Sequence, residues 1–591
     1  MSDRRKTTQG RAGKSAGTGA VYTVSITDLS NLGYGVGRLP ADGDAPGASD
    51  AGSGAAGKVI FVRGAVTGDT VETAVIKETA GYLVGRLVRV VTPSPLREPA
   101  QFCTAPEACG GCVFRHLTYA AELESKHRRV QSAFRQAGLA DVRVLPPLST
   151  GRTAGYRNKG MYPVQAGRNG MQAGFYAAKS HRLIPCADCA LQPPAFAGVV
   201  GTVCRFCDRE HIPAYDETTG AGILRHIYLR TTAAGEIMVC LVINADGLPG
   251  GRAAEARLVD CLLAEQPRTV SVLLNINRRN TNVVLGEQYR KLYGSGWIED
   301  TLCGLRFRLS AGSFYQVNRE GAELLYETAA RMAEVRGGES LWDLYCGAGT
   351  IGLSMLSPGR NARPAQVTGV EIVPEAVACA EQNARLNAEA GRIPPDAAHF
   401  FCADAGDAAA LFAAADTGAA PAPDIVIIDP PRKGTTPELI RELARRGVPR
   451  VVYVSCDPET LARDCALFRA SGYAVGEVQP VDMFPRTGHV ETVCLLSKLQ
   501  SKEHIEIEVK MDELDLTAAE SKATYEEIRE YVLEHTGLKV SHLYIAQVKQ
   551  KYGIIEQENY NKPKSENARQ PKCTPEKEAA IIDALRYFQM I

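Results

Sequence analysis

The first part of the chain alternates apolar and polar residues with the two-residue period of half-buried β-strands. Three short runs carry this pattern: Val21–Ile26, Lys58–Val62 and Thr70–Ile76. They predict a small β-barrel over residues 21–92, with the Gly, Ala, Ser and Asp run at 41–57 as a flexible loop inserted in one hairpin. Small barrels of this kind bind RNA or act as spacers, and the pattern favours neither role.

In the second half, buried strands alternate with helical stretches, which is typical of a parallel sheet in an α/β fold. The predicted strands are Ser340–Cys346, Val367–Val370, Phe400–Asp404, Asp424–Ile428 and Val451–Val454. We therefore expect a Rossmann-like α/β domain over residues 309–499. The other expected parts are a disordered basic start (1–20), an α+β central domain (93–308) and a helical extension (500–591).

The strand Val451–Val454 leads to a thiol, Cys456, and Pro458 then begins a helical run. In an open α/β sheet, ligands bind beyond the carboxyl ends of the strands, where Cys456 would lie. A helix amino-terminus beside a thiol favours the reactive thiolate. Taken alone, the pattern favours a buried structural cysteine, which is common in proteins.

Carboxylates follow the other strands of this domain. The strand ending at Cys346 runs into Gly347-Ala-Gly349-Thr-Ile-Gly352, a loop that allows close approach of a ligand to the backbone. Glu371, 22 residues after Gly349, stands where an acid binds ribose hydroxyls. The glycine loop and Glu371 would also suit NAD as the cofactor. A hydride-transfer enzyme, however, has no use for Asp429-Pro-Pro followed by a thiol at the end of a strand. These features together favour a methyltransferase, with Asp404 facing an adenine amino group.

Composition sets outer limits on function. The 591 residues carry 67 basic and 67 acidic side chains, so no whole-chain positive field indicates nucleic acid. No apolar run is long enough to span a bilayer, and the first six residues lack the apolar core of a signal peptide. We expect a cytoplasmic protein with no membrane association and no stable protein partner. In that compartment, 17 cysteines indicate metal binding, catalysis or burial rather than disulfides.

Three of these cysteines, Cys103, Cys109 and Cys112, lie within ten residues, and two glycines separate the last pair. An iron–sulfur cluster or a zinc ion needs a fourth ligand, for which two downstream pairs are available: Cys186 with Cys189, and Cys204 with Cys207. Those four residues could instead form a zinc site of their own. We expect the triad plus one distant thiol.

Five motifs make the chain resemble a known family. They are Phe314-Tyr-Gln-Val-Asn318, Asp343-Leu-Tyr-Cys-Gly-Ala-Gly349, Asp429-Pro-Pro-Arg-Lys-Gly434, Val454-Ser-Cys-Asp-Pro458 and Met483-Phe-Pro-Arg-Thr-Gly-His-Val-Glu-Thr492. With them the chain resembles the RNA 5-methyluridine methyltransferases, most of all the iron–sulfur 23S rRNA (uracil-C5)-methyltransferases of the RumA/RlmD type. The resemblance covers about residues 20–499 and leaves the tail outside the family core.

The resemblance implies a TRAM (OB-like) barrel, a cluster-bearing central domain and a Rossmann-like S-adenosylmethionine domain. It implies a [4Fe-4S] cluster held by Cys103, Cys109, Cys112 and Cys189. Cofactor contacts are implied at Gln316, Tyr345, Glu371, Asp404 and Asp429, of which Asp404 is the least firmly matched because some members have Asn there. Cys186 and Cys207 are spare thiols that blur the ligand assignment.

The chemistry of uracil explains why a thiol and a carboxylate would be used together. Uracil C5 is a poor nucleophile until a thiolate adds to C6, which is the role expected of Cys456. After methyl transfer a base must remove the C5 proton, and Glu491 is the candidate. The uridine must be unstacked to reach the thiol. The expected substrate is 23S rRNA; transfer RNA, and a non-catalytic RNA-binding or assembly factor, are the alternatives.

Overall fold

The computed structural model describes most of the chain, in two compact units that are treated separately: residues 1–500 and 501–591. The residues described are 19–30, 32–39, 57–99, 102–105, 108–178, 180–281, 283–407, 411–412, 416–417, 420–499, 525–536, 538, 540–551 and 574–587. The expected disordered start and inserted loop fall almost wholly outside these residues.

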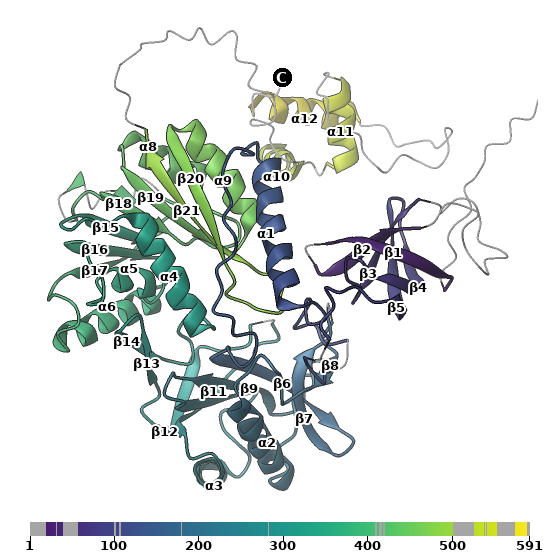
Figure 1. Cartoon of the computed structure of the whole chain (residues 1–591), viewed down its shortest axis with the longest axis vertical. Coiled ribbons are helices and arrows are strands. Elements are labelled where there is room, and N and C mark those ends of the chain that lie inside the picture. The colour runs from purple at the N-terminus through teal and green to yellow at the C-terminus, as the bar shows by residue number, and fades with distance from the viewer. Residues whose placement is uncertain are drawn as a thin grey trace, which may run out of the picture. The chain divides into compact units, whose positions relative to one another are not determined.

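The amino-terminal strands close into a five-stranded barrel of order β1-β2-β3-β5-β4 (Figure 1). They are β1 (Val21–Leu29), β2 (Tyr34–Arg38), β3 (Val59–Arg63), β4 (Thr70–Glu78) and β5 (Tyr82–Thr92). Alternate residues such as Val24, Ile60 and Val62 fill its core. The predicted small barrel is confirmed, and the predicted insertion lies between β2 and β3.

The central region contains a second, mixed sheet of seven strands, in the order β12-β11-β10-β9-β6-β7-β8. Its strands are β6 (Lys159–Gly167), β7 (Gly170–Tyr176), β8 (Leu183–Pro185), β9 (Leu224–Thr231), β10 (Ile237–Ile243), β11 (Thr269–Ile276) and β12 (Gln288–Gly294). Helices α2 (Pro194–Arg209) and α3 (Gly251–Glu265) accompany it, and a hairpin of β13 (Ile298–Leu302) and β14 (Leu305–Leu309) follows.

The third sheet has the order β17-β16-β15-β18-β19-β21-β20, with only β21 antiparallel to its neighbours. Its strands are β15 (Ser340–Leu344), β16 (Gln366–Glu371), β17 (Ala398–Cys402), β18 (Ile425–Ile428), β19 (Arg450–Ser455), β20 (Tyr473–Val481) and β21 (Glu491–Lys498). Helix α4 (Arg319–Ala333) precedes β15, and the helices between the strands are α5 (Thr350–Met355), α6 (Pro374–Glu389), α8 (Pro437–Arg445) and α9 (Pro458–Ala470).

Successive residues of β18 explain why its sequence is continuously apolar. Ile425 and Ile427 belong to one hydrophobic core, whereas Val426 and Ile428 belong to another on the opposite face. A parallel strand buried on both faces requires apolar side chains in both directions. The sheet is therefore covered on both sides, which confirms the expected Rossmann-like α/β domain.

Helix α1 (Tyr119–Gln136) packs against α9, although it lies more than 300 residues earlier in the chain. Val130 and Phe134 join the core beneath α9. The segment after α1 also touches the third sheet, where Val144 bridges Val478. This part of the central region is therefore built onto the third sheet, which the local pattern of α1 does not reveal.

A buried ionic group fixes α1 in place. The Lys126 ammonium donates to Glu122 Oε1 and to Asp482 Oδ1, both at 2.7 Å, and its side chain is 1% exposed. Tyr119 donates to the other Asp482 oxygen at 2.8 Å, and Glu122 accepts the backbone N–H of Arg486 at 2.7 Å. Burial nevertheless raises the pKa of Glu122 to about 7. The helix is thereby joined to residues 482–486, which lead into β21.

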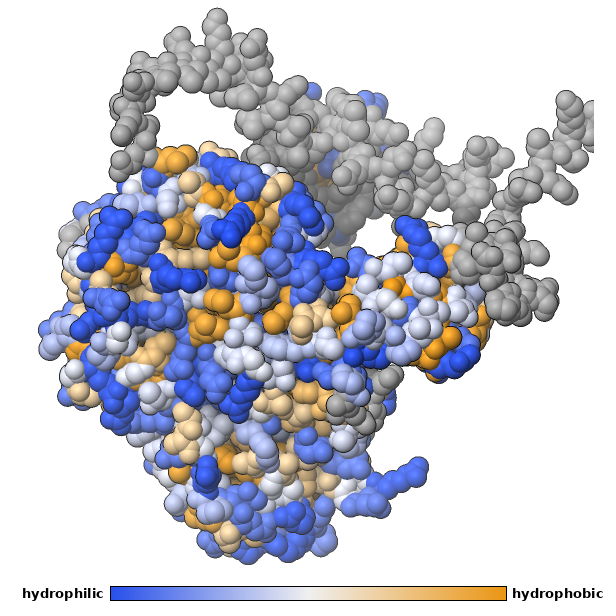
Figure 2. Space-filling view, in the orientation of Figure 1, coloured by the Kyte–Doolittle hydropathy of each residue, from blue (hydrophilic) through white to orange (hydrophobic). Residues whose placement is uncertain are grey.

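The second unit contains three helices around a small apolar core. They are α10 (Tyr525–Thr536), α11 (His542–Lys551) and α12 (Pro575–Tyr587), within the tail where a helical extension is expected. No helix in the described part of the chain has the length and apolar character needed to cross a bilayer. On the face shown in Figure 2, hydrophobic residues are interspersed with hydrophilic ones.

Candidate active site

The carboxyl ends of the parallel strands place the predicted functional residues along one edge of the third sheet. Asp429 follows β18, Cys456 follows β19, and Glu371 ends β16. Asp404 comes two residues after β17, which spans Ala398–Cys402 and so ends two residues earlier than predicted.

Cys456 and Glu491 are brought together by strand register. Because β19 and β21 are antiparallel with Ser455 opposite Thr492, the next pair along is Cys456 and Glu491. The Thr492 hydroxyl also donates to the Ser455 carbonyl at 3.0 Å. Two residues 35 positions apart in the sequence therefore face each other at the sheet edge.

The thiol of Cys456 is half-buried, and its pKa is raised to about 11. Burial is the main cause, followed by the negative charges of Glu491 and Asp429; a hydrogen bond and the positive charge of Arg432 act in the opposite direction. Asp457 caps the helix that follows by accepting the Thr460 N–H at 2.9 Å. The expected preference for the thiolate is therefore wrong for the protein without ligands, because burial and two carboxylates outweigh the helix amino-terminus.

Glu491 is 4% exposed. Burial, with a further contribution from Asp429, raises its pKa to about 8, and Arg432 opposes the shift. Burial also raises the pKa of Asp429 to about 7. The site thus groups a thiol, two carboxyls that hold protons near neutral pH, and one arginine. Arg432 was not among the predicted site residues, although its place directly after Asp-Pro-Pro was the available signal.

The glycine loop after β15 forms a cradle beside these groups. Gly347 and Gly349 have left-handed backbones (φ of 55° and 76°), and a Cβ added at Gly347 would meet no atom within 4 Å. The Glu371 carboxylate accepts the Gly347 N–H at 3.1 Å and thereby holds the loop. Buried Asp343 accepts the Gly352 N–H at 2.7 Å, while its other oxygen has no hydrogen-bond partner. Open space at Gly347 and carboxylates at the rim of the loop fit a nucleoside-bearing cofactor.

Two further predicted cofactor residues border this cradle. Tyr345 has a left-handed backbone (φ of 63°), and its hydroxyl pairs with that of Thr435 at 3.3 Å. The negative charge of exposed Asp404 is among the causes that raise the pKa of Tyr345, after burial. Gln316 contacts the central region instead. Its backbone carbonyl accepts a hydrogen bond from the Asn158 side-chain amide at 2.8 Å.

Comparison with known proteins decides the family. A TRAM-domain profile matches residues 17–88, and a profile described as tRNA (uracil-5-)-methyltransferase matches residues 224–499. An RNA methyltransferase of Halalkalibacterium halodurans is 35% identical over 478 residues, covering 80% of this chain and 96% of that protein. The chain belongs to the (uracil-5-)-methyltransferase family of RNA methyltransferases.

Two further comparisons agree. A Bacillus cereus RNA methyltransferase is 36% identical over 446 residues, which is 75% of this chain and 93% of the relative. The tRNA (uracil-54, C5)-methyltransferase of Pyrococcus abyssi, solved with S-adenosyl-L-homocysteine, has 25% identity and a TM-score of 0.61; the match covers 80% of this chain and 99% of that one. The chain is thus an S-adenosylmethionine-dependent RNA methyltransferase with an amino-terminal TRAM domain.

The cysteines named for a cluster in this family lie near one another without forming a recognisable metal site. The negative charges of Cys189, Cys103 and Cys109 contribute to raising the pKa of Cys112 to about 12, after burial. Within the described residues, no group of three or more His, Cys, Asp or Glu is arranged to hold a metal ion. The [4Fe-4S] assignment therefore stays a prediction.

The alternative zinc set is disfavoured by where its second pair lies. Cys204 and Cys207 are on α2, and Cys207 belongs to the apolar core of the central sheet. Cys186 instead shares a hydrogen bond with Cys189. Cys189 thus has a thiol neighbour, and its pKa is lowered to about 7, mainly by that hydrogen bond.

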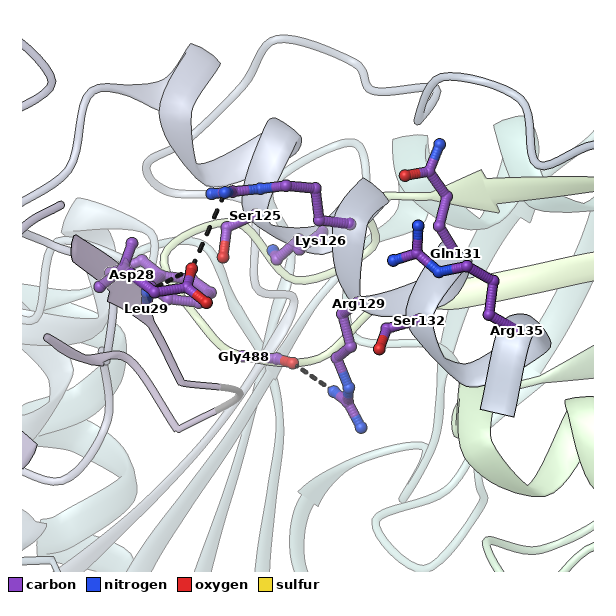
Figure 3. A pocket seen from close by; sticks show the side chains of 11 residues that line it. Asp28, Leu29, Ser125, Lys126, Arg129, Gln131, Ser132, Arg135 and Gly488 are labelled. Atoms are coloured by element: carbon purple, nitrogen blue, oxygen red, sulfur yellow. Dashed lines mark hydrogen bonds and ion pairs between the residues drawn. The ribbon is translucent and has the colours of Figure 1, made fainter. Parts of the chain in front are cut away.

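Arg129 of α1 contacts the two segments that carry Cys456 and Glu491. Its guanidinium pairs with both carboxylate oxygens of Glu459, at 3.0 and 2.7 Å, three residues after Cys456. It also donates to the Gly488 carbonyl at 2.9 Å, three residues before Glu491 (Figure 3).

Proposed function

We propose that this protein methylates uridine at C5 in 23S ribosomal RNA through a covalent bond between Cys456 and C6 of the base. The observation that carries the proposal is the register that sets Cys456 opposite Glu491. Addition to C6 requires a thiol, and proton removal from C5 requires a base such as a carboxyl. Both groups must reach the same uracil ring.

Bound S-adenosylmethionine supplies the methyl group, and Glu371, Asp404, Tyr345, Asp429 and Gln316 are the residues proposed to hold it. The glycine loop offers the space, and the strand-end carboxylates offer acceptors for its hydroxyl and amino groups. Because the methyl donor is already activated, the role of the protein is to position the reactants and to supply charged groups around them.

Cys456 forms the first bond. Its thiol gives up a proton to water and the thiolate adds to C6, so that the C5–C6 electron pair moves onto the carbonyl oxygen and C5 becomes nucleophilic. C5 then bonds the methyl group, and the electron pair of the broken sulfur–methyl bond stays on the cofactor sulfur. Arg432, which hydrogen-bonds the Cys456 sulfur, favours the thiolate against burial.

Glu491 completes the cycle. Glu491 must first release the proton that it holds near neutral pH; its carboxylate then takes the proton from C5, the C5–C6 double bond forms again, and the Cys456 sulfur leaves C6. Burial suits this role, because a base with a pKa near 8 holds a proton more strongly than an exposed carboxylate does.

The direct test uses RNA carrying 5-fluorouridine at the target, since fluorine cannot leave C5 as a cation. Wild-type protein should form a stable protein–RNA adduct, Cys456→Ala should form none, and the matched variant Cys261→Ala should behave as wild type. An adduct formed by Cys456→Ala would refute the proposed nucleophile.

The choice of RNA is tested by mapping 5-methyluridine in ribosomal and transfer RNA from cells with and without the protein. Loss of 5-methyluridine from 23S rRNA in cells without the protein supports the proposal. Loss from transfer RNA would favour the substrate that the family profile and the Pyrococcus protein name. Unchanged RNA in both would favour the non-catalytic factor.

The cysteine loop supports the ribosomal choice, since it resembles the cluster-bearing members. We propose that Cys103, Cys109, Cys112 and Cys189 hold a [4Fe-4S] cluster, with the proximity of the other three to Cys112 as support. Anaerobically purified protein should contain about four iron atoms per chain. Cys189→Ser should lose them and Cys204→Ser should keep them; zinc without iron would overturn the assignment.

A further inference from the structure

A polar groove of about 310 Å³ lies between the end of β1 and helix α1 (Figure 3). Asp28 and Leu29 of the barrel form one side, and Gly488 of the loop before β21 also lines it. The remaining wall comes mostly from one stretch of α1, with Ser125, Lys126, Arg128, Arg129, Gln131, Ser132 and Arg135. None of the roles described above accounts for this groove.

Two of its four cations are already neutralised inside the protein. Lys126 is buried between Glu122 and Asp482. Arg129 is held by Glu459 and the Gly488 carbonyl. Both residues shape the groove, and neither is available to a ligand without breaking a short charged contact.

Arg128 and Arg135 differ in being exposed. They are seven residues apart, so both lie on one face of α1, about 10 Å apart along its axis. The nearest acids to Arg128 are Asp28 at 3.8 Å and Glu124 at 3.7 Å, and exposed pairs at such distances contribute little. Asp28 is the one acid among the lining residues, so the available charge of the groove is positive.

Neutral donors fill the space between these arginines. Gln131 and Ser132 lie within the same two turns, and Figure 3 shows them with Arg135 along one stretch of the helix. Two cations with an amide and a hydroxyl between them match the oxygens of successive phosphodiesters, which proteins bind with Arg, Gln and Ser side chains.

The groove also lies beside the active site, because Arg129 and Gly488 are shared. Gly488 precedes Glu491 by three residues, and Arg129 reaches the helix that begins just after Cys456. A strand whose uridine enters that site must continue over the neighbouring surface, and this groove is the polar surface joined to both catalytic segments.

We propose that the groove binds the sugar-phosphate backbone of the RNA strand next to the target uridine, with Arg128 and Arg135 as the phosphate-binding residues. This inference rests on the proposed function for its substrate. Phosphate contacts position a strand without reading its sequence, so the groove sets the register in which a uridine is presented.

The test measures binding of single-stranded oligouridylate to the full chain, without S-adenosylmethionine, across a series of salt concentrations. The double variant Arg128→Gln/Arg135→Gln should bind more weakly, and its logarithmic salt slope should be smaller by about 1.4, or roughly 0.7 for each lost contact. The control Arg441→Gln/Arg445→Gln changes two exposed arginines on α8 and should leave both values as in wild type.

A second probe separates phosphate from base recognition. With methylphosphonate linkages, which carry no charge, the wild type and the groove variant should bind alike. Equal salt slopes on natural RNA, or an equal loss in the control pair, would overturn the inference. Because binding is measured without methyl transfer, a wild-type protein that binds RNA but never makes 5-methyluridine would refute the proposed function and leave the groove in place.

Discussion

Replacing Glu491 by Gln should make the protein more stable, and increasingly so as the pH rises. The folded protein holds the Glu491 proton up to about pH 8, whereas an exposed glutamate loses it near 4.5. Glutamine has a similar shape and no charge to bury. The variant therefore removes the cost of ionising a 4%-exposed carboxyl.

The sign and size of the effect follow from linkage. Below about pH 4.5 both folded and unfolded chains hold the proton, and Glu491 contributes nothing. Between about 4.5 and 8 the unfolded chain binds fewer protons, so folding loses about 1.4 kcal/mol for each pH unit. Above pH 8 the accumulated cost approaches about 5 kcal/mol, an upper value for one buried group.

The pH-dependent difference in stability between Glu491→Gln and wild type is measured by thermal melting, followed by tryptophan fluorescence. One of the two tryptophans, Trp342, is buried in β15, so the signal reports on the methyltransferase sheet. The difference in melting temperature between Glu491→Gln and wild type should be near zero at about pH 5 and reach several degrees by about pH 8. Glu477→Gln, a surface change on β20, is the control. A difference that stays flat with pH would show that Glu491 titrates as an ordinary exposed carboxyl, and the case for its role as a buried base would fail.

Other changes have distinct expected outcomes. Cys456→Ala should abolish methyl transfer but retain S-adenosylmethionine binding by calorimetry, because the thiol touches the base and not the cofactor; loss of cofactor binding would contradict this. Arg129→Ala should lower kcat more than it raises the RNA KM in steady-state assays, since it frees both catalytic segments, and a pure KM effect would be inconsistent with that role. Lys126→Met should destabilise the protein by about 3–5 kcal/mol in denaturant unfolding, because the buried carboxylates of Glu122 and Asp482 lose the ammonium between them; a loss below 1 kcal/mol would mean that water reaches the site. Alkylation of Cys456, followed by peptide mass spectrometry, should shift to lower pH when S-adenosylmethionine binds, because a cation near Asp429 favours the thiolate, and an unchanged profile would refute that coupling.

Local sequence pattern was sufficient for much of the fold. The buried run before Cys456 and the proline after it predicted β19 and α9, and the glycine loop predicted the turn after β15. These features depend on residues close together in the chain, whose periodicity and turn chemistry are visible in a single sequence.

Long-range features were not predictable in the same way. The pairing of Ser455 with Thr492 and the docking of α1 on α9 depend on contacts between distant segments. The protonation of Cys456 was predicted in the wrong direction, because the helix start was visible in the sequence but the burial and the two neighbouring carboxyls were not.

The ion pair between Lys126 and Asp482 has a consequence for the making of the protein. Its two residues are 356 positions apart, so at 5–20 residues per second the ribosome needs roughly 20 to 70 s to deliver the aspartate after the lysine. During that time the Lys126 ammonium has Glu122 of the same helix as a counter-charge but lacks Asp482, and burying the incomplete group early would be unfavourable. Helix α1 must therefore stay exposed to water, or bound to a chaperone, until the segment that contains Asp482 has been synthesised. A nascent chain that stops before residue 482 should be degraded rather than stored, because its first long helix has nowhere to dock.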